Sequence, residues 1–275
     1  SQETQLEMSK KIHLPLSDYK ILNEYCEIVG IKFLSTPFDH VSIKCLTDLD
    51  MDFFKIPSGE ITNYPYLVEV AKAGKKTILS TGMSNLNEIK DALNVLIING
   101  LSKKDITILH CNTDYPTSLN DVNLKAMLHI KNELNVQVGY SDHTLGLEAS
   151  LAATALGAKI IEKHFTIDRK LQGPDHKASL LPEEFAMLVK SIRNIEKLMS
   201  GSGLKEPSKS ELKNIVVARK SIMGKRNIKK GEIFSVDNLI IKRPGNGLNP
   251  MKWNEIIGLP ATRDYKCDEL IEDTL

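Results

Sequence analysis

The chain has 275 residues, of which 41% are hydrophobic and 26% charged, a composition typical of a globular protein with one large or two unequal domains. Its formal net charge of +1 excludes a strongly basic nucleic-acid-binding protein and gives no reason to expect an anionic membrane as partner. No apolar run approaches the ~20 residues of a membrane-spanning helix, and the four cysteines have no paired spacing, so we expect a reduced, cytoplasmic protein.

Short apolar runs bounded by Gly, Pro, Ser or Asp alternate with longer amphipathic runs along most of the chain. The short runs have the character of buried parallel strands, and the longer runs have the character of helices. We expect strands at 31–35, 53–56, 77–79, 106–110, 136–139 and 159–162. We expect helices at 18–29, 66–73, 86–98, 122–134, 147–156 and 182–199.

This alternation predicts βα units around a parallel sheet, which is either doubly wound or closed into a (β/α)8 barrel. No Gly-x-Gly-x-x-Gly turn follows a predicted strand, which disfavours a dinucleotide-binding sheet. Polar motifs instead follow strand after strand, as in a barrel, whose active site gathers residues from the ends of many strands. We predict a (β/α)8 TIM barrel over residues 1–199. Because two of its βα units are missing and the chain begins at Ser1, we expect those units to precede it.

The amino-acid composition and the pattern of apolar residues change after residue 199. Residues 200–212 are rich in Gly, Ser, Pro and Lys, which predicts a linker. Residues 213–275 contain short β-like pieces separated by Lys-Lys-Gly and Pro-Gly turns. We therefore predict a small β-rich domain at 213–275.

Each predicted strand of the barrel is followed by a polar motif. In chain order these are STPFD at 35–39, KIPSGE at 55–60, STGM at 80–83, HCNTDYPT at 110–117, GYSDHTLG at 139–146 and EKHFT at 162–166. The carboxyl ends of parallel barrel strands meet at one mouth, so we expect the side chains of these motifs to converge.

Two histidines, His143 and His164, follow consecutive predicted strands. Two neutral imidazoles can hold a divalent metal and leave positions open for water and substrate. A single histidine at a strand end is more often a hydrogen-bonded structural residue. Asp142 and Glu162 beside this pair favour the functional interpretation, because carboxylates orient such ligands or perform acid–base chemistry.

Hydroxyl and ammonium groups also gather at the strand ends. Ser58, Ser80 and Ser141 follow three of the strands, and several converging donors are what a phosphate needs. Serines also occur in turns for purely local reasons. Lys55 is more telling, because it lies inside the apolar run FFKIPS, where a lysine needs a partner.

Three further residues have the chemistry of sugar contacts. Tyr115 can stack on a sugar or cap its own loop, and Asp175, in the sequence GPD, either accepts from sugar hydroxyls or belongs to an ordinary turn. Arg243 lies in a Pro-Gly loop behind the predicted linker, where a guanidinium can present a fork of donors or remain an ordinary surface group.

Taken together, these motifs resemble those of the sialic acid (N-acylneuraminate) synthase family. KIPSGE, STGM, SDHT and EKHFT stand in the family's order, and KRPGNGL at 242–248 resembles its C-terminal antifreeze-like (SAF) domain. The resemblance covers essentially the whole chain. It implies an N-acetylneuraminate synthase, in which carbon 3 of phosphoenolpyruvate attacks the aldehyde of open-chain N-acetylmannosamine, water adds at carbon 2 and phosphate leaves.

The resemblance also implies roles for individual residues. His143 and His164 match the pair that binds Mn²⁺ or Mg²⁺, and Arg243 matches an arginine that enters a neighbouring subunit's site in a domain-swapped homodimer. The residues matched to catalysis are Lys55, Glu60 and Glu162. The residues matched to substrate binding, besides Arg243, are Thr36, Ser58, Ser80, Thr113, Tyr115, Ser141 and Asp175.

Two departures and two alternatives accompany this interpretation. Thr113 stands where some members of the family carry Asn, and the family's first two βα units, which supply an early Glu, a Lys and an Asn or Gln, are absent. A related legionaminic or pseudaminic acid synthase would use a 2,4-diacetamido-6-deoxyhexose instead. A non-catalytic sugar-binding protein is the alternative from another class, and intact Lys55, His143, His164 and Glu162 argue against it.

Overall fold

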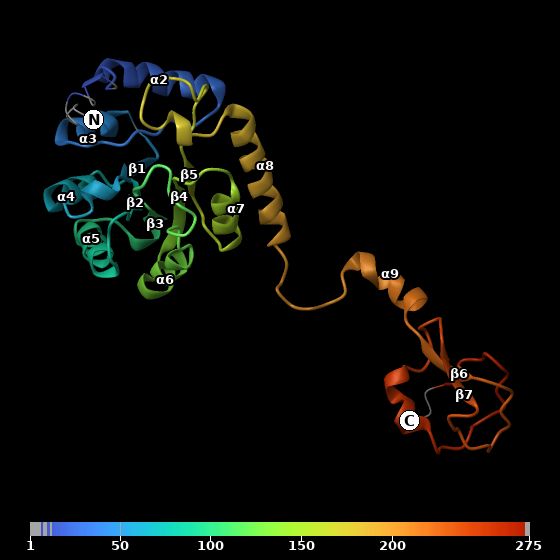
Figure 1. Cartoon of the computed structure of the whole chain (residues 1–275). Helices are drawn as coiled ribbons and strands as arrows, with labels where there is room; N and C mark the ends of the chain where they lie inside the picture. The colour runs from blue at the N-terminus through green and yellow to red at the C-terminus, as the bar shows by residue number, and fades with distance from the viewer. Residues whose placement is uncertain (1–6, 8–9, 12, 50, 273–275) are drawn as a thin grey trace. The chain divides into compact units, whose positions relative to one another are not determined.

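The computed structural model of the protein describes residues 7, 10–11, 13–49 and 51–272. These belong to two compact units, one extending to Gly201 and the other beginning at Ser202 (Figure 1). The outer ends of the two predicted domains, residues 1–6 and 273–275, lie outside the described residues. No helix in this described part of the chain is both long and apolar enough to cross a bilayer.

A five-stranded parallel sheet forms the centre of the first unit. Its strands are β1 (Phe53–Ile56), β2 (Lys76–Ser80), β3 (Ile106–Cys111), β4 (Gln137–Asp142) and β5 (Ile161–Lys163). They lie side by side in chain order, and every pair is parallel. A doubly wound sheet reverses its strand order at a switch point, so this uninterrupted order favours the barrel type of winding over the alternative.

Helices follow the strands and cover the outer side of the sheet, as Figure 1 shows for α4 to α7. From residue 13 to residue 201, residue 50 apart, the helices are α2 (Leu16–Val29), α3 (His40–Asp48), α4 (Tyr64–Lys72), α5 (Leu86–Ile98), α6 (Lys125–Leu134), α7 (Glu148–Ala155) and α8 (Pro182–Leu198). Three short 3₁₀ turns accompany them, namely η1 (Ser58–Glu60), η2 (Lys103–Asp105) and η3 (His176–Ala178).

The sheet is strongly curved, and one contact across it demonstrates this. Lys55 of β1 and Glu162 of β5 come from the two edge strands, yet their side chains meet at 3.0 Å. In a flat sheet, four steps of about 4.8 Å would separate these strands by about 19 Å, which is more than the two side chains can bridge. The predicted barrel is thus a five-stranded half-barrel in the described residues, and closure by eight strands is not shown.

The apolar core lies between the sheet and its helices. Ile56, Leu79, Ile106 and Ile108 of the strands are almost completely buried, and so is Leu96 of α5. A side chain that leaves water for such a layer contributes roughly 1.5–3 kcal/mol. This packing holds the strands in register and thereby positions the residues at their carboxyl ends.

The predicted strand at 31–35 is wrong. Residues 31–38 run as irregular chain that precedes α3, and Ile31 and Leu34 are 63% and 44% exposed. A buried parallel strand needs a hydrogen-bonded neighbour, whereas in the described residues β1 pairs with β2 alone. The run is apolar enough for a strand but lacks a partner.

Two helices, α3 and α9 (Lys209–Ala218), were not predicted. The start of α3 carries a clear local signal, because the carboxylate of Asp39 accepts the backbone N–H of Ser42 at 2.8 Å. At the start of α9, Glu211 accepts the N–H of Ser208, which is half of a capping box. The end of the predicted linker, residues 209–212, is therefore helical.

The second unit is small and contains little regular structure. After α9, its antiparallel strands β6 (Ser221–Gly224) and β7 (Leu239–Lys242) pair, followed by η4 (Pro250–Lys252) and α10 (Trp253–Ile256). Isolated bridges such as Ile228 with Tyr265 extend the pairing. Its own core includes Ile222, Phe234 and Tyr265, all at most 2% exposed, which agrees with a β-rich domain folded around a separate apolar centre.

Candidate active site

The carboxyl ends of the five parallel strands place the polar motifs along one edge of the half-barrel. Lys55 lies in β1, Ser80 ends β2, Ser141 lies in β4 and Glu162 lies in β5. Ser141 and Glu162 are direct neighbours in the ladder between β4 and β5. The convergence predicted from the motifs therefore holds for these residues.

Lys55, Ser141 and Glu162 form the centre of this cluster. The Lys55 ammonium lies 3.1 and 3.0 Å from the two carboxylate oxygens of Glu162. The Ser141 hydroxyl donates to one of those oxygens at 2.7 Å. The Lys55 side chain is 9% exposed, whereas that of Glu162 is 38% exposed and remains open to the concave side.

These contacts decide the charge of Glu162. Burial by itself raises the pKa of this carboxyl, but the Lys55 ammonium and the hydrogen bond from Ser141 outweigh burial, so the net pKa is lowered. Glu162 is therefore an anion at neutral pH, and Lys55 is held as its counter-ion. A negatively charged ligand entering here would meet a lysine that is already fixed in position.

Three rings stand together beside this pair. The ring centroids of His143 and His164 are 5.3 Å apart, and the ring of Tyr115 lies 4.0 Å from the first and 5.4 Å from the second. Tyr115 is 44% exposed and comes from the loop after β3. Burial raises the pKa of its phenol, which therefore stays protonated and can donate to a sugar oxygen.

The surroundings of the two histidines leave the second nitrogen of each ring available. Nδ1 of His143 lies 2.5 Å from the carbonyl oxygen of Asn112, and since a carbonyl only accepts, Nδ1 carries the proton. Burial lowers the pKa of His143, so its ring is neutral at neutral pH. Nδ1 of His164 lies 3.6 Å from a carboxylate oxygen of Asp175. Within the described residues, no hydrogen bond or ion pair engages Nε2 of either ring, so each can bind a ligand.

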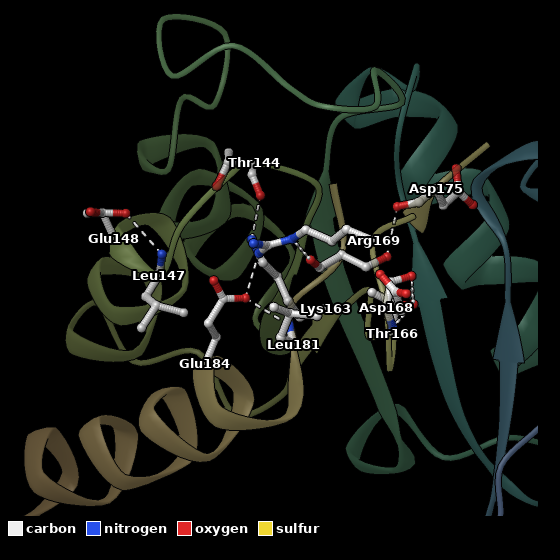
Figure 2. A network of polar contacts seen from close by, with 11 residues as sticks. Thr144, Leu147, Glu148, Lys163, Thr166, Asp168, Arg169, Asp175, Leu181 and Glu184 are labelled. Carbon is white, nitrogen blue, oxygen red and sulfur yellow. Dashed lines mark hydrogen bonds and ion pairs between the residues drawn. The ribbon is translucent and has the colours of Figure 1, made fainter. Parts of the chain in front are cut away.

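The loop that carries Asp175 is attached to the start of α8. Arg169 donates to the carbonyl of Ser179 at 3.0 Å and to the carboxylate of Glu184 at 2.5 Å. The same carboxylate accepts the N–H of Leu181 (Figure 2). These contacts fix the loop at its far end and hold Asp175 near His164.

This donor set fits a catalytic metal site better than a structural one. Among the residues that the structure describes, no group of three or more His, Cys, Asp and Glu side chains has the arrangement of a metal cage. Two imidazoles backed by a carbonyl and a carboxylate leave coordination positions for water and substrate oxygens. The chemistry of His143 and His164 therefore suits a divalent metal bound together with substrate.

The ends of β1, β2 and β3 pack tightly around a glycine. The N–H of Gly82 donates to the Ser58 hydroxyl at 2.9 Å, and that hydroxyl lies 3.3 Å from the thiol of Cys111. A Cβ at Gly82 would lie only 2.5 Å from a methyl carbon of Thr113. Only glycine allows this close approach, which holds Ser58 and Thr113 on neighbouring loops.

Two buried side-chain oxygens lack a hydrogen-bond partner in the described residues, namely those of Ser80 and Asn112. Ser80 is 3% exposed and lies at the end of β2, between the strands of Lys55 and Cys111. An unsatisfied buried hydroxyl costs about 1–3 kcal/mol. A ligand oxygen that accepts from Ser80 would recover this cost.

Three predicted site residues stand outside the cluster. The Glu60 carboxylate accepts from the side chain of Asn63 at 2.6 Å, at the start of α4. Thr36 is half-buried in the irregular chain that replaces the first predicted strand. Arg243 belongs to the second unit, where it donates to the carbonyl of Ala218 at 3.0 Å.

One charged residue of the site region was not singled out from the sequence. Lys163 forms an ion pair with Asp142, and their side chains are 1% and 0% exposed. The signal for it was present, because Lys163 directly follows the predicted strand at 159–162, and a lysine beside a strand that packs in the fold needs a partner there. The buried carboxylate of Asp142 was expected only as a companion of the histidines.

Comparison with known proteins identifies the family. Residues 1–205 match the model of the NeuB family, and residues 215–274 match that of the SAF domain. The chain belongs to the NeuB family. Its predicted resemblance to this family, with a C-terminal SAF domain, is therefore confirmed.

Several relatives of this NeuB-family chain are sugar-acid synthases. The N,N'-diacetyllegionaminic acid synthase of Campylobacter jejuni is 55% identical, over 98% of this chain and 81% of that protein. The enzyme of the same name from Legionella pneumophila is 46% identical, over 93% and 72% of the two chains. The crystal structure of a sialic acid synthetase from Leptospira borgpetersenii in complex with citrate is 36% identical with a TM-score of 0.70, covering 76% and 72%. The NeuB-family chain is thus a phosphoenolpyruvate-dependent enzyme that forms carbon–carbon bonds.

Proposed function

We propose that the protein is an N,N'-diacetyllegionaminic acid synthase. The 55% identity to the Campylobacter jejuni enzyme carries this proposal. Pseudaminic acid synthases from the same species are 34% identical, and the human N-acetylneuraminate-9-phosphate synthase is 36% identical. These values favour the legionaminic acid alternative over the N-acetylneuraminate synthase expected first from the sequence.

The proposed reaction joins phosphoenolpyruvate to open-chain 2,4-diacetamido-6-deoxymannose. Carbon 3 of phosphoenolpyruvate forms a bond to the aldehyde carbon, and the aldehyde oxygen takes up a proton. Water adds at carbon 2, the bond from carbon 2 to the phosphate oxygen breaks, and phosphate leaves. The product is a nine-carbon 2-keto sugar acid.

The polar cluster is suited to phosphoenolpyruvate. The Lys55 ammonium provides positive charge for its phosphate and carboxylate, in a place where Lys55 is already held by Glu162. Ser58 and Ser141 contribute hydroxyls from the ends of β1 and β4, and the hydroxyl of Ser80, which has no partner among the described residues, is free to donate to a ligand oxygen. The cluster therefore supplies convergent donors for an anion.

We assign acid–base catalysis to the carboxylates of Glu162 and Glu60. Glu162 is ionised and half-buried, so it is suited to accept a proton from the water that adds at carbon 2. Glu60 is the second member of the proposed acidic pair. Its side chain contacts Asn63, so its proposed role requires a rotation of the side chain toward the reacting carbons.

The sugar would lie over the three rings. His143 and His164 would hold Mn²⁺ or Mg²⁺, which when bound supplies Lewis-acid polarisation of the aldehyde oxygen. Tyr115 offers a ring face and a hydroxyl next to both histidines. The side chains proposed to contact the remaining sugar oxygens and N-acyl groups are those of Thr36, Thr113 and Asp175.

An assay of phosphate release tests this proposal. The purified protein is supplied with phosphoenolpyruvate and Mn²⁺, and kcat/KM is compared for 2,4-diacetamido-6-deoxymannose, its altrose isomer and N-acetylmannosamine. We expect the first sugar to be favoured by about 10-fold or more, because each extra pocket contact contributes 1–3 kcal/mol. Omitting the sugar controls for simple hydrolysis. Preference for either other sugar would contradict the legionaminic acid proposal, and no release with any sugar would contradict the condensation.

We further propose that Arg243 completes the site of a second subunit in a domain-swapped homodimer. Arg243 lies in the second unit, which follows a stretch rich in Gly, Ser and Pro. A guanidinium supplied from there would add a fork of donors for the sugar or for phosphoenolpyruvate.

Mixed dimers test the role of Arg243. Lys55→Met and Arg243→Ala each inactivate both sites of a homodimer, but a hybrid dimer keeps one intact site if Arg243 acts on the other subunit. Co-expression of the two variants should therefore restore about a quarter of the wild-type activity when subunits pair at random. An inactive mixture in which hybrid dimers are present by mass spectrometry would show that Arg243 does not act across subunits.

A further inference from the structure

A buried ion pair stands directly behind the two histidines. The Lys163 ammonium lies 2.9 Å from a carboxylate oxygen of Asp142, and their side chains are 1% and 0% exposed. Asp142 immediately precedes His143, and Lys163 immediately precedes His164. The two charged residues are direct partners in the ladder between β4 and β5. The pair therefore joins the last rungs of the two strands from which the histidines emerge.

The pair lies on the opposite face of the sheet from the candidate site. Successive side chains of a strand point to opposite faces, so Asp142 and Lys163 point away from the side of Ser141 and Glu162. The hydroxyl of Ser150, in α7, donates to Asp142 at 2.5 Å, which places the carboxylate in the layer between sheet and helix. The pair thus has no need to touch a substrate in order to influence the site.

The same two residues also hold the backbone that follows His143. The carboxylate of Asp142 accepts the N–H of Thr144 at 2.8 Å and its hydroxyl at 2.7 Å. Lys163 donates to the carbonyl of Thr144 at 2.6 Å, a contact drawn in Figure 2. Three hydrogen bonds to Thr144 therefore fix the backbone that follows His143. The ladder between β4 and β5 fixes the backbone that precedes it.

A fully buried ion pair by itself contributes little to the stability of a fold. Removing both charges from water costs several kcal/mol per ion, and apolar residues of the same size often stabilise a fold as well or better. Its advantage is geometric, because both groups need partners at defined distances and angles. The partners of this pair are Thr144, in the turn directly after β4, and Ser150 of α7, and the pair itself joins β4 to β5. The geometry it defines is therefore the spacing of the two strand ends and the turn that follows His143.

We propose that Asp142 and Lys163 are positioning residues that set the spacing of His143 and His164 for a shared divalent cation. This proposal rests on the proposed function, which assigns a cation to the two imidazoles. The pair holds the two strand ends at a fixed separation, so the two imidazoles, whose ring centroids are 5.3 Å apart, stay close enough to share one ion. Residues that orient metal ligands from behind commonly change metal affinity by 10- to 100-fold when they are replaced.

The test measures Mn²⁺ affinity of the purified protein without substrates, from the electron paramagnetic resonance signal of free Mn²⁺. We expect Lys163→Met to weaken affinity by about 10- to 100-fold and Lys163→Arg to keep most of it. Asp142→Asn combined with Lys163→Met should weaken it no more than the stronger single variant, because the two side chains act as one unit. Ser150→Ala, which removes only one donor to Asp142, should give a smaller loss in a protein that folds normally.

A core variant separates positioning from general destabilisation. Ile130→Ala in α6 removes a buried apolar side chain that is 5% exposed and lies outside the site. Its Tm should fall as much as that of Lys163→Met, while its Mn²⁺ affinity stays at the wild-type value. Equal loss of affinity in both variants would overturn the positioning role.

The remaining outcomes distinguish this proposal from the one on which it rests. If the wild type binds Mn²⁺ and His164→Ala does not, but Lys163→Met and Ser150→Ala both bind like the wild type, the positioning role is wrong and the metal assignment stands. If the wild type binds no Mn²⁺, or if His164→Ala binds it equally well, the metal assignment fails and the positioning role fails with it.

Discussion

Replacing Lys55 with methionine is expected to lower kcat/KM for the condensation by on the order of 10³-fold, the effect of losing a preorganised charge contact in a partly dry site. Lys55 is the cation that lies 3.0 Å from Glu162 across the curved sheet. Methionine keeps most of the side-chain length and removes the charge. The loss should be seen as phosphate released from phosphoenolpyruvate in the presence of the acceptor sugar and Mn²⁺.

The same variant should change the pH dependence in a defined direction. The ammonium of Lys55 lowers the pKa of Glu162 against the opposing effect of burial. Without this cation the pKa of Glu162 rises, so its carboxylate becomes protonated at a higher pH. The residual activity of Lys55→Met should therefore begin to fall at a higher pH than wild-type activity as the solution is acidified.

A lysine at the amino end of a strand, away from the candidate site, provides the control. Lys76 begins β2, is exposed and lies over the ring of Phe53. Lys76→Met removes the same charge from the same sheet and should leave both kcat/KM and the pH profile near the wild-type values. If Lys55→Met kept activity within a few-fold of wild type, the pair of Lys55 and Glu162 would be structural only.

Alanine at His143 or His164 is expected to abolish metal-dependent condensation and to weaken Mn²⁺ binding by more than about 100-fold, beyond the effect of replacing a residue behind the ligands. Nδ1 of His143 is engaged by a carbonyl oxygen and Nδ1 of His164 lies 3.6 Å from a carboxylate, while in the described part of the chain Nε2 of each ring has no partner. Since burial lowers the pKa of His143, its free nitrogen has a lone pair at neutral pH. Activity measured after chelation and after Mn²⁺ is restored should recover in the wild type and not in either histidine variant.

His129 supplies a matched substitution away from the site. It lies in α6 and is exposed, so His129→Ala should lose and regain activity with chelation and Mn²⁺ as the wild type does. The metal assignment would be contradicted by a His143→Ala variant that still regains activity when Mn²⁺ is added.

Local patterns were sufficient to place most elements to within a few residues of their bounds. The predicted ranges 53–56 and 86–98 coincide with β1 and α5. In the second case, Asn85 and Glu88 form a capping box that marks the start of the helix. The prediction of a strand at 31–35 was wrong because a parallel strand forms only beside a hydrogen-bonded neighbour, and the local sequence does not show whether that neighbour exists.

The sequence by itself determined which side chains line the strand ends and, through their motifs, the family. Parallel strands bring their carboxyl ends to one edge whatever their exact curvature, so Lys55, Ser141 and Glu162 were identifiable from order alone. Only the tertiary structure decided that Lys55 meets Glu162 across the sheet and that Asp142 pairs with Lys163 behind the histidines. These contacts depend on the curvature of the sheet and on the depth of burial beneath α7, which result from the packing of the whole layer and have no signature in any single motif.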